Sequence, residues 1–219
     1  MTSDTDKRAA AIAAVGEIQP GMLVGLGTGS TAAHAVAALA DRVRAGLRIT
    51  AVVTSKATEA LAQSHGLTVL PFDDVPQVDL TIDGVDQIDP ALRAIKGGGG
   101  AMLREKIVAA ASTRMIAIAD GSKRVAQLDR AIPVEILPFA RAFVLRRLAD
   151  LGGPAVLRAT RSDQHNLLAD AAFGPIADPA ALAAELSAIP GLLGHGLFLD
   201  EIDATCIADD GGIVWQKRS

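Results

Sequence analysis

Short apolar runs alternate with helix-like segments along the first 130 residues of this 219-residue chain. Compact apolar runs predict strands, whereas apolar residues at helical spacing predict amphipathic helices. The expected strands are 22–26, 48–54, 67–71, 78–83 and 114–119, and the expected helices are 9–15, 30–40, 57–65 and 105–111. Regular alternation predicts an α/β fold, with a Rossmann-like, mostly parallel sheet and helices on both of its faces.

The pattern changes after about residue 130, where antiparallel strands and two helices are expected. The expected elements are strand 134–137, helix 140–151, strands 156–160 and 167–171, helix 179–188 and strand 192–199. They predict a smaller α+β domain of ferredoxin-like type, inserted near the C-terminus. Asp209-Asp210-Gly211-Gly212 then separates two apolar runs, as in a β-hairpin, which we expect to rejoin the larger domain. The predicted domains are 1–130 with 203–219, and 131–202.

Composition argues against several classes of partner. Aromatic residues make up 3% of the chain and the net charge is −4, so neither stacking platforms nor a basic field is offered to nucleic acid. No apolar run approaches the roughly 20 residues that span a bilayer, and the polar start is unlike a signal peptide. The single cysteine, Cys206, cannot form an internal disulfide. We expect a cytoplasmic protein that binds neither nucleic acid nor membranes.

A glycine-rich turn, Gly25–Thr31 (GLGTGST), connects the first expected strand to its helix. Backbone N–H groups and the helix dipole at such a turn suit a phosphate group. A dinucleotide fingerprint would need a glycine where Ser30 stands, and a Walker A loop would need a Gly-Lys pair. The alternative is a tight turn in which Ser30 or Thr31 caps the helix.

Three further polar loops follow expected strands: Thr54-Ser55-Lys56, Asp83–Asp89 (DGVDQID) and Asp120-Gly121-Ser122-Lys123. The carboxyl ends of parallel strands meet at one edge of a sheet, where open α/β sheets bind ligands. The aspartates could orient sugar hydroxyls or coordinate Mg²⁺, although the spacing of a calcium loop is absent and the four histidines are scattered. Taken singly, the first of these loops is better explained as a capped helix start with a solvated lysine, and the second as an acidic turn.

The strongest local signal is Lys96 followed by four glycines and a helix (KGGGGAMLREK). Ordering four glycines costs maximal backbone entropy, so the run indicates that the backbone must approach something closely. A flexible linker would be richer in serine and polar residues. Glu105, near the start of the helix, either points back to the loop or faces solvent beside Arg104 and Lys106.

Together, these loops resemble the type A family of ribose-5-phosphate isomerases. The resemblance covers most of the chain and rests on five motifs in the family's order: GLGTGSTA (25–32), TSKAT (54–58), DGVDQID (83–89), KGGGGAMLREKIVA (96–109) and DGSK (120–123). It continues through residues 133–135 and 188–191. Gln87 departs from the family, which usually has Glu there, and residues 162–166 match only loosely.

The resemblance implies interconversion of D-ribose 5-phosphate and D-ribulose 5-phosphate through a cis-enediol, in the non-oxidative pentose phosphate pathway, without metal or cofactor. By match to the family, Glu105 is the base that moves the proton between C2 and C1. The implied catalytic residues are Glu105, Asp83, Asp86 and Lys96. The implied substrate-binding residues are Thr28, Gly29, Ser30, Thr31, Asp83, Gly84, Val85, Asp86, Lys96, Gly97, Gly98, Gly99 and Lys123, with Lys7 a weaker candidate.

Two other functions are compatible with a sheet of this type. A sugar-phosphate-binding regulator would normally carry a helix-turn-helix segment, and the first motif begins too early to leave room for one. An acyl-CoA transferase relative would use Glu105 as a nucleophile instead of a base. The apolar small domain further suggests a homodimer.

Overall fold

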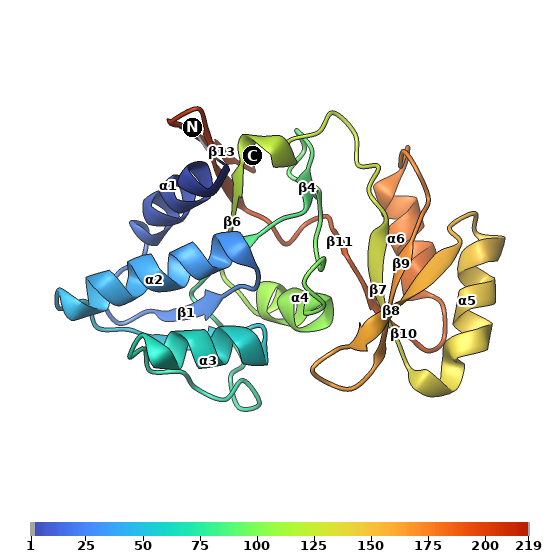
Figure 1. Cartoon of the computed structure of the whole chain (residues 1–219), viewed down its shortest axis with the longest axis horizontal. Helices are drawn as coiled ribbons and strands as arrows, with labels where there is room; N and C mark the ends of the chain where they lie inside the picture. Colours follow the sequence, from blue (N-terminus) through green and yellow to red (C-terminus); the bar gives the residue numbers. More distant parts are fainter. Residues whose placement is uncertain (1–2, 219) are drawn as a thin grey trace. The chain divides into compact units, whose positions relative to one another are not determined.

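The computed structural model describes residues 3–218, which form two compact units (Figure 1). The large unit comprises residues 3–85, 104–123 and 200–218, and the small unit comprises 86–103 and 124–199. The sequence-based boundaries differ, because they assigned 86–103 and 124–130 to the large domain and 200–202 to the small one. The reason is long-range pairing within the small unit: a short strand of the 86–103 segment pairs with residues 197–198, near the end of that unit.

A six-stranded sheet, in the order β13-β12-β6-β3-β1-β2, forms the centre of the large unit. Its strands are β1 (Leu23–Leu26), β2 (Thr50–Val53), β3 (Leu80–Gly84), β6 (Met115–Asp120), β12 (Ala204–Asp209) and β13 (Gly212–Lys217). All neighbouring pairs are parallel except β12 and β13. The mostly parallel sheet is thereby confirmed, and the carboxyl ends of β1, β2, β3 and β6 share one edge.

Helices cover both faces of this sheet, as expected. They are α1 (Ser3–Val15), α2 (Ser30–Arg44), α3 (Lys56–Ser64) and α4 (Met102–Ala110). Neighbouring residues of β2 point to opposite faces: Ala51 packs in the core formed with α1, α2 and α3, whereas Val52 packs with Val108 of α4. Several alanines of α1 and α2 are fully buried, so the small aliphatic residues of the sequence allow these helices to pack closely on the sheet.

Three local expectations were wrong. Residues 67–71 form no strand and contribute only an isolated bridge from Val69 to Ala51, since Pro71 lacks an N–H and Leu70 is exposed. Helix α1 extends back to Ser3, six residues before its expected start at Ala9. Helix α4 begins at Met102, three residues before its expected start.

The predicted hairpin is confirmed and rejoins the large unit through β12, which pairs with β6. Asp210 and Gly211, at the turn, have φ values of 47° and 83°. Two positive φ angles in succession are what a type I′ turn requires, so the Asp-Gly pair fits the geometry. Cys206 of β12 is buried, and burial together with the nearby charge of Glu17 raises the pKa of its thiol to about 12.

The small unit contains a βαββαβ arrangement with the ferredoxin-like strand order β10-β7-β9-β8, all antiparallel. Its elements are β7 (Ile132–Ile136), α5 (Arg141–Asp150), β8 (Ala155–Arg161), β9 (Leu167–Ala171), α6 (Pro179–Ser187) and β10 (Leu192–His195). This confirms the predicted smaller α+β fold.

A second, three-stranded sheet of the small unit pairs β11 (Leu197–Phe198), β5 (Ala94–Ile95) and β4 (Gln87–Ile88). The single strand expected over 192–199 is therefore two strands in different sheets. They separate at Gly196, where a Cβ atom would lie 2.2 Å from the carbonyl oxygen of Lys96. No helix among residues 3–218 has the length and apolar character needed to cross a bilayer.

An ion pair in the large unit provides a test of pH-dependent stability. Lys106 of α4 donates to Glu201 at 2.7 Å, and both side chains are about four-fifths buried. Burial alone raises the pKa of Glu201, but the charge and hydrogen bond of Lys106 outweigh burial and hold this pKa below its usual 4.5.

We expect Glu201→Gln to lower the free energy of unfolding by about 1 kcal/mol at pH 7. Because the folded-state pKa is depressed, the contribution is fully present above pH 4.5 and is lost as the pH falls through the folded-state pKa. Urea titrations at several pH values would measure this, with Glu185→Gln on the exposed face of α6 as control. An equal loss at pH 7 and at low pH would contradict the assignment.

Candidate functional site

Asp83, at the carboxyl end of β3, organises the glycine turn after β1. Its side chain is 0% exposed, and its Oδ1 accepts the N–H groups of Thr28 at 3.0 Å and of Gly84 at 2.7 Å. A Cβ atom on Gly27 would lie 1.9 Å from the same oxygen, so the turn requires glycine there. The structure thus brings Thr28, Asp83 and Gly84 together, as the motifs predicted, with Asp83 holding the backbone of the turn.

A cluster of hydroxyl groups joins the turn to the loop after β2. The Oγ1 atom of Thr28 lies 2.7 Å from Oγ1 of Thr54 and 2.9 Å from Oγ of Ser55, and Thr58 donates to the carbonyl of Gly27 at 2.9 Å. Ser55 caps α3 by accepting the N–H of Thr58 at 3.1 Å. The sequence identified this loop as a candidate but did not indicate its role. In the structure its hydroxyl groups contact the Thr28 turn and support it.

Helix α2 begins directly after the turn, with Gly29 rather than Ser30 or Thr31 at its N-cap position. Gly29 has a φ of 106°, which favours glycine, and no side chain caps the helix. Ser30 is exposed and accepts a hydrogen bond from Lys7 of α1 at 3.3 Å, whereas Thr31 is buried. A helix N-terminus, a hydroxyl and a lysine therefore lie together at this edge.

The loop after β6 adds a fourth group to the edge. Lys123 is half-buried in the 3-10 turn η1 (Gly121–Lys123). Burial raises the pKa of Asp120, but hydrogen bonds from Ser122 and Ser3, together with the charge of Lys123, lower it below its usual 3.8. Asp120 is therefore a carboxylate that fixes the turn carrying Lys123.

Glu105 lies in the first turn of α4 and is 3% exposed. The alternative of a solvent-facing acid is therefore wrong, and so is that of Lys106 as a solvated residue, since Lys106 pairs with Glu201. A carboxylate near a helix N-terminus is favoured by the helix dipole. Glu105 is thus a buried acid on the helix that follows the glycine run.

Lys96 is one of the largest fully buried side chains of the small unit, with 2% exposure. Its Nζ lies 5.3 Å from the centroid of the Phe198 ring, so a cation–π contact offsets part of the cost of burial. A buried lysine directly before a glycine run is a cation kept away from bulk water. Because the protein interior screens charge less than water does, its field on a bound group is strong.

The glycine run after Lys96 is an ordered loop in contact with Asp86, and so not a linker. Oδ2 of Asp86 accepts the N–H of Gly98 at 2.8 Å. Gly97 has a φ of 101° and Gly100 a φ of 85°, and a Cβ atom on Gly97 would lie 2.4 Å from Cβ of Met102. The N–H of Gly98 is therefore already used by Asp86, which qualifies the expectation that all three amides of 97–99 meet the substrate.

Gln87, the departure from the family pattern, has a clear structural role within the small unit. Its Nε2 donates to the carboxylate of Asp129 at 2.6 Å, while its Oε1 accepts the N–H groups of Asp129 at 3.1 Å and Arg130 at 2.9 Å. A carboxylate in this position could only accept, whereas the amide of Gln87 both donates and accepts.

We expect Gln87→Glu to lower the free energy of unfolding by about 1–2 kcal/mol, because it sets a carboxylate against Asp129 and removes a hydrogen bond. Combining it with Asp129→Asn should restore most of the loss, since the asparagine amide can donate to the new carboxylate. Urea denaturation of the two variants would measure this. A Gln87→Glu protein as stable as the parent would show that these bonds do not matter.

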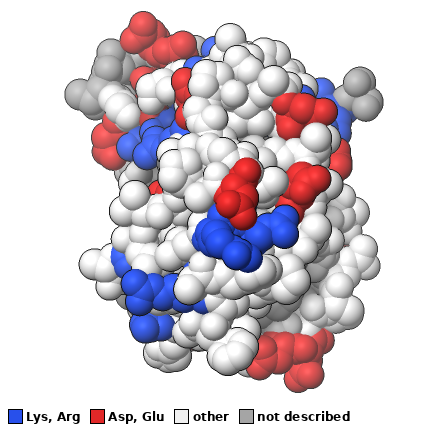
Figure 2. Space-filling model, turned by 90° about the vertical axis from the view of Figure 1, so that its right-hand side faces the viewer, with Lys and Arg blue, Asp and Glu red and all other residues white. Residues whose placement is uncertain are grey.

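The remaining predicted residues are placed as follows. Val85 is buried and ends the large unit's first segment, and Asp86 begins the small unit. Residues 3–218 contain no group of three or more His, Cys, Asp or Glu side chains suited to a metal ion. On the face drawn in Figure 2, basic and acidic side chains lie in small adjacent groups among uncharged surface.

Comparison with known proteins agrees with these motifs. Residues 50–212 match the family model of ribose 5-phosphate isomerase A (phosphoriboisomerase A). A ribose-5-phosphate isomerase A from Sphingopyxis alaskensis is 55% identical over 209 residues, covering 93% of this chain and 92% of that protein. One from Methanosarcina acetivorans is 47% identical, covering 97% and 94%.

Solved structures give the same result. Ribose 5 phosphate isomerase A from Neisseria gonorrhoeae superposes with a TM-score of 0.94 at 35% identity, covering 100% of this chain and 98% of the other. A D-ribose-5-phosphate isomerase in complex with phospho-erythronic acid superposes with a TM-score of 0.95 at 32% identity, with complete coverage of both chains. The chain belongs to the ribose-5-phosphate isomerase A family.

Proposed function

We propose that this protein interconverts D-ribose 5-phosphate and D-ribulose 5-phosphate through a cis-enediol, with Glu105 as the proton-transferring base. Family membership supports the overall reaction. The observation that carries the assignment of the base is the position of Glu105, a carboxylate 3% exposed in the first turn of the helix that follows the glycine loop.

An aldose–ketose shift needs one base that removes a proton from C2 and returns it to C1. A single carboxylate can do both if it reaches the two carbons, and burial protects the reactive enediol from side reactions in bulk water. Glu105 meets the second requirement, since its side chain is almost completely buried.

Negative charge develops on the substrate's carbonyl oxygen as the proton leaves. Lys96 and the amides of the glycine loop are the proposed partners of this charge, a role worth about 3–4 kcal/mol per donor in comparable sites. Asp83 and Asp86 are proposed to act on the sugar hydroxyls and in ring opening. Asp86 uses Oδ2 to hold Gly98, and its Oδ1 makes no hydrogen bond within residues 3–218, so that oxygen can accept one from a hydroxyl.

The phosphate is proposed to bind where α2 begins. Thr28, Gly29, Ser30 and Thr31 supply hydroxyl and amide groups at a helix N-terminus, and Lys123 and Lys7 supply positive charge. The relative solved with phospho-erythronic acid supports a phosphorylated, hydroxylated ligand.

Lys123→Ala should raise KM for ribose 5-phosphate by about tenfold or more, with kcat changed by less than about threefold. The reason is that a charge-assisted contact to phosphate stabilises the bound substrate and the transition state equally. Steady-state kinetics would measure both constants. Lys217→Ala, on the exposed strand β13, is the control. An unchanged KM in Lys123→Ala would mean that other groups hold the phosphate.

The reaction itself is tested by following ribulose 5-phosphate formation from ribose 5-phosphate, with and without EDTA, in deuterated water. We expect conversion that EDTA does not affect, with solvent hydrogen incorporated at the transferred position. No conversion would overturn the proposal. Activity lost to EDTA and restored by Mg²⁺ would indicate a metal-dependent reaction, and trapping of Glu105 by hydroxylamine with a thioester substrate would indicate acyl transfer.

A homodimer and a cytoplasmic location stay predictions from the sequence. The small unit carries exposed apolar side chains, among them Phe139 at 96% and Val156 at 74% exposure, which would be covered in a dimer. Analytical ultracentrifugation of the full chain would measure its mass in solution.

A further inference from the structure

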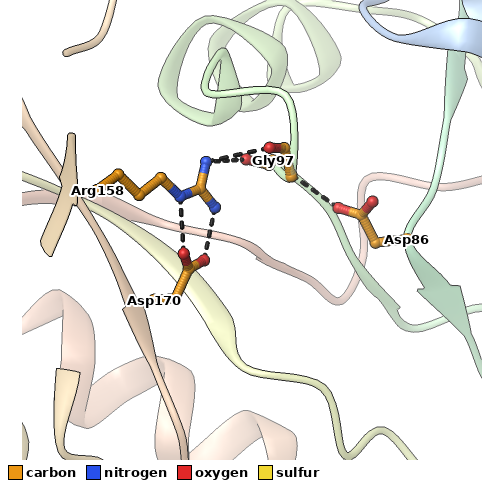
Figure 3. A network of polar contacts seen from close by, with 5 residues as sticks. Asp86, Gly97, Arg158 and Asp170 are labelled. Atoms are coloured by element: carbon orange, nitrogen blue, oxygen red, sulfur yellow. Dashed lines mark hydrogen bonds and ion pairs between the residues drawn. The ribbon is translucent and has the colours of Figure 1, made fainter. Parts of the chain in front are cut away.

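Two opposed contacts hold one peptide group of the glycine loop. Nη1 of Arg158 donates to the carbonyl oxygen of Gly97 at 3.1 Å, and the N–H of Gly98 donates to Asp86 at 2.8 Å (Figure 3). That carbonyl and that N–H belong to the same planar peptide. The plane between Gly97 and Gly98 is therefore fixed at both ends.

The same guanidinium also sets the orientation of the next peptide. Nη1 of Arg158 lies 3.2 Å from the carbonyl oxygen of Gly98. The peptide is trans, so its N–H, which belongs to Gly99, points away from Arg158. Gly99 is exposed, and its N–H donates no hydrogen bond within the part of the chain that the structure describes. The loop therefore presents the Gly99 amide outward.

Arg158 is itself held in place by Asp170 of the neighbouring strand. Nε donates to Oδ2 at 2.8 Å and Nη2 to Oδ1 at 2.6 Å, a bidentate pair in which the arginine side chain is 16% exposed. Arg158 lies where the register of β8 and β9 shifts, between Leu157 and Arg161. Such an irregularity redirects side chains, and here one edge of the guanidinium binds Asp170 while Nη1 reaches the loop.

We propose that Arg158, oriented by Asp170, is a positioning residue for the isomerase reaction. It fixes the glycine loop so that the Gly99 amide is oriented, before substrate binds, toward the oxygen on which charge develops. A run of four glycines samples many conformations, and a donor stabilises a transition state well only if it is ordered beforehand. This inference rests on the proposed isomerase function and adds Arg158 and Asp170 to it.

The test compares Arg158→Lys and Arg158→Ala with Arg161→Ala, a matched control on the same strand. Arg161 also donates Nη1 to a carbonyl, that of His165 at 3.0 Å, but away from the glycine loop. Lysine keeps the charge opposite Asp170 but lacks the planar guanidinium group needed to bind the carboxylate and both carbonyls together.

We expect kcat to fall about 10- to 100-fold in both Arg158 variants, with KM within about threefold and Arg161→Ala unchanged. Methylguanidine should restore part of the kcat of Arg158→Ala, and amide hydrogen exchange of residues 97–100 should accelerate in Arg158→Lys. A purely structural role would predict neither rescue nor a selective loss of kcat.

Absence of isomerase activity in the unmodified protein would overturn both proposals. If the unmodified protein is active and a folded Arg158→Lys protein keeps its kcat within twofold, the positioning role alone is overturned. It is also overturned if the loss of activity in both variants equals the loss of folded protein measured by circular dichroism.

Discussion

Glu105→Gln should lower kcat by about a thousandfold while KM changes by less than about tenfold. Glutamine has nearly the same shape as glutamate, so the buried site keeps its packing and the first turn of α4 keeps its length. The amide cannot take a proton from C2, which removes the proposed chemical step but little of the binding. Steady-state kinetics and exchange of the substrate's C2 hydrogen with deuterated water would measure the two effects.

The matched control is Glu59→Gln, because Glu59 is the fourth residue of α3 just as Glu105 is the fourth of α4. Both substitutions remove one negative charge from the first turn of a helix, so the helix dipole is affected alike. Glu59→Gln should keep kcat within about twofold. Near-normal turnover and exchange in Glu105→Gln would exclude Glu105 as the base.

Lys96→Met should lower kcat by about 100- to 1000-fold, without loss of stability. Methionine fills a volume similar to that of the lysine chain, so the contact with Phe198 remains apolar, while the charge proposed to stabilise the developing oxyanion is lost. A buried cation is costly, and its removal can therefore raise the melting temperature.

Kinetics and thermal denaturation of Lys96→Met would be compared with Lys217→Met, an exposed substitution on β13 that should change neither. A tenfold or larger rise in KM with unchanged kcat would instead indicate that Lys96 stabilises the bound substrate and the transition state equally. Unchanged kcat and KM together would remove Lys96 from the mechanism.

Much of the fold could be predicted because it depends on local patterns. The parallel order of strands and helices follows from alternating apolar runs, and the hairpin follows from Asp210 and Gly211, whose φ angles are both positive. The prediction failed where a neighbour decided the outcome. Residues 192–199 were predicted to form one strand. In the structure the backbone of Lys96 packs so closely on Gly196 that the segment divides between two sheets.

The candidate site was predictable to a similar degree. The motifs identified Asp83, Lys96 and Glu105 as candidates because loops after parallel strands gather at one edge. They did not distinguish residues that hold the loops from residues that would meet the substrate. Asp83 holds the Thr28 turn and Asp86 holds Gly98, and these bonds join residues 55 and 12 positions apart.

The amino-acid sequence alone determined the class of fold, the glycine-rich loops and the resemblance on which the proposed reaction rests, since these depend on residue types at short spacing. Tertiary structure alone decided that Glu105 and Lys96 are buried and that Arg158 and Asp170 hold the glycine loop. Arg158 is 60 or more residues from the carbonyls that it binds, and no local pattern encodes such a contact. Only chain folding, with the irregular pairing of β8 and β9, brings that guanidinium to the loop.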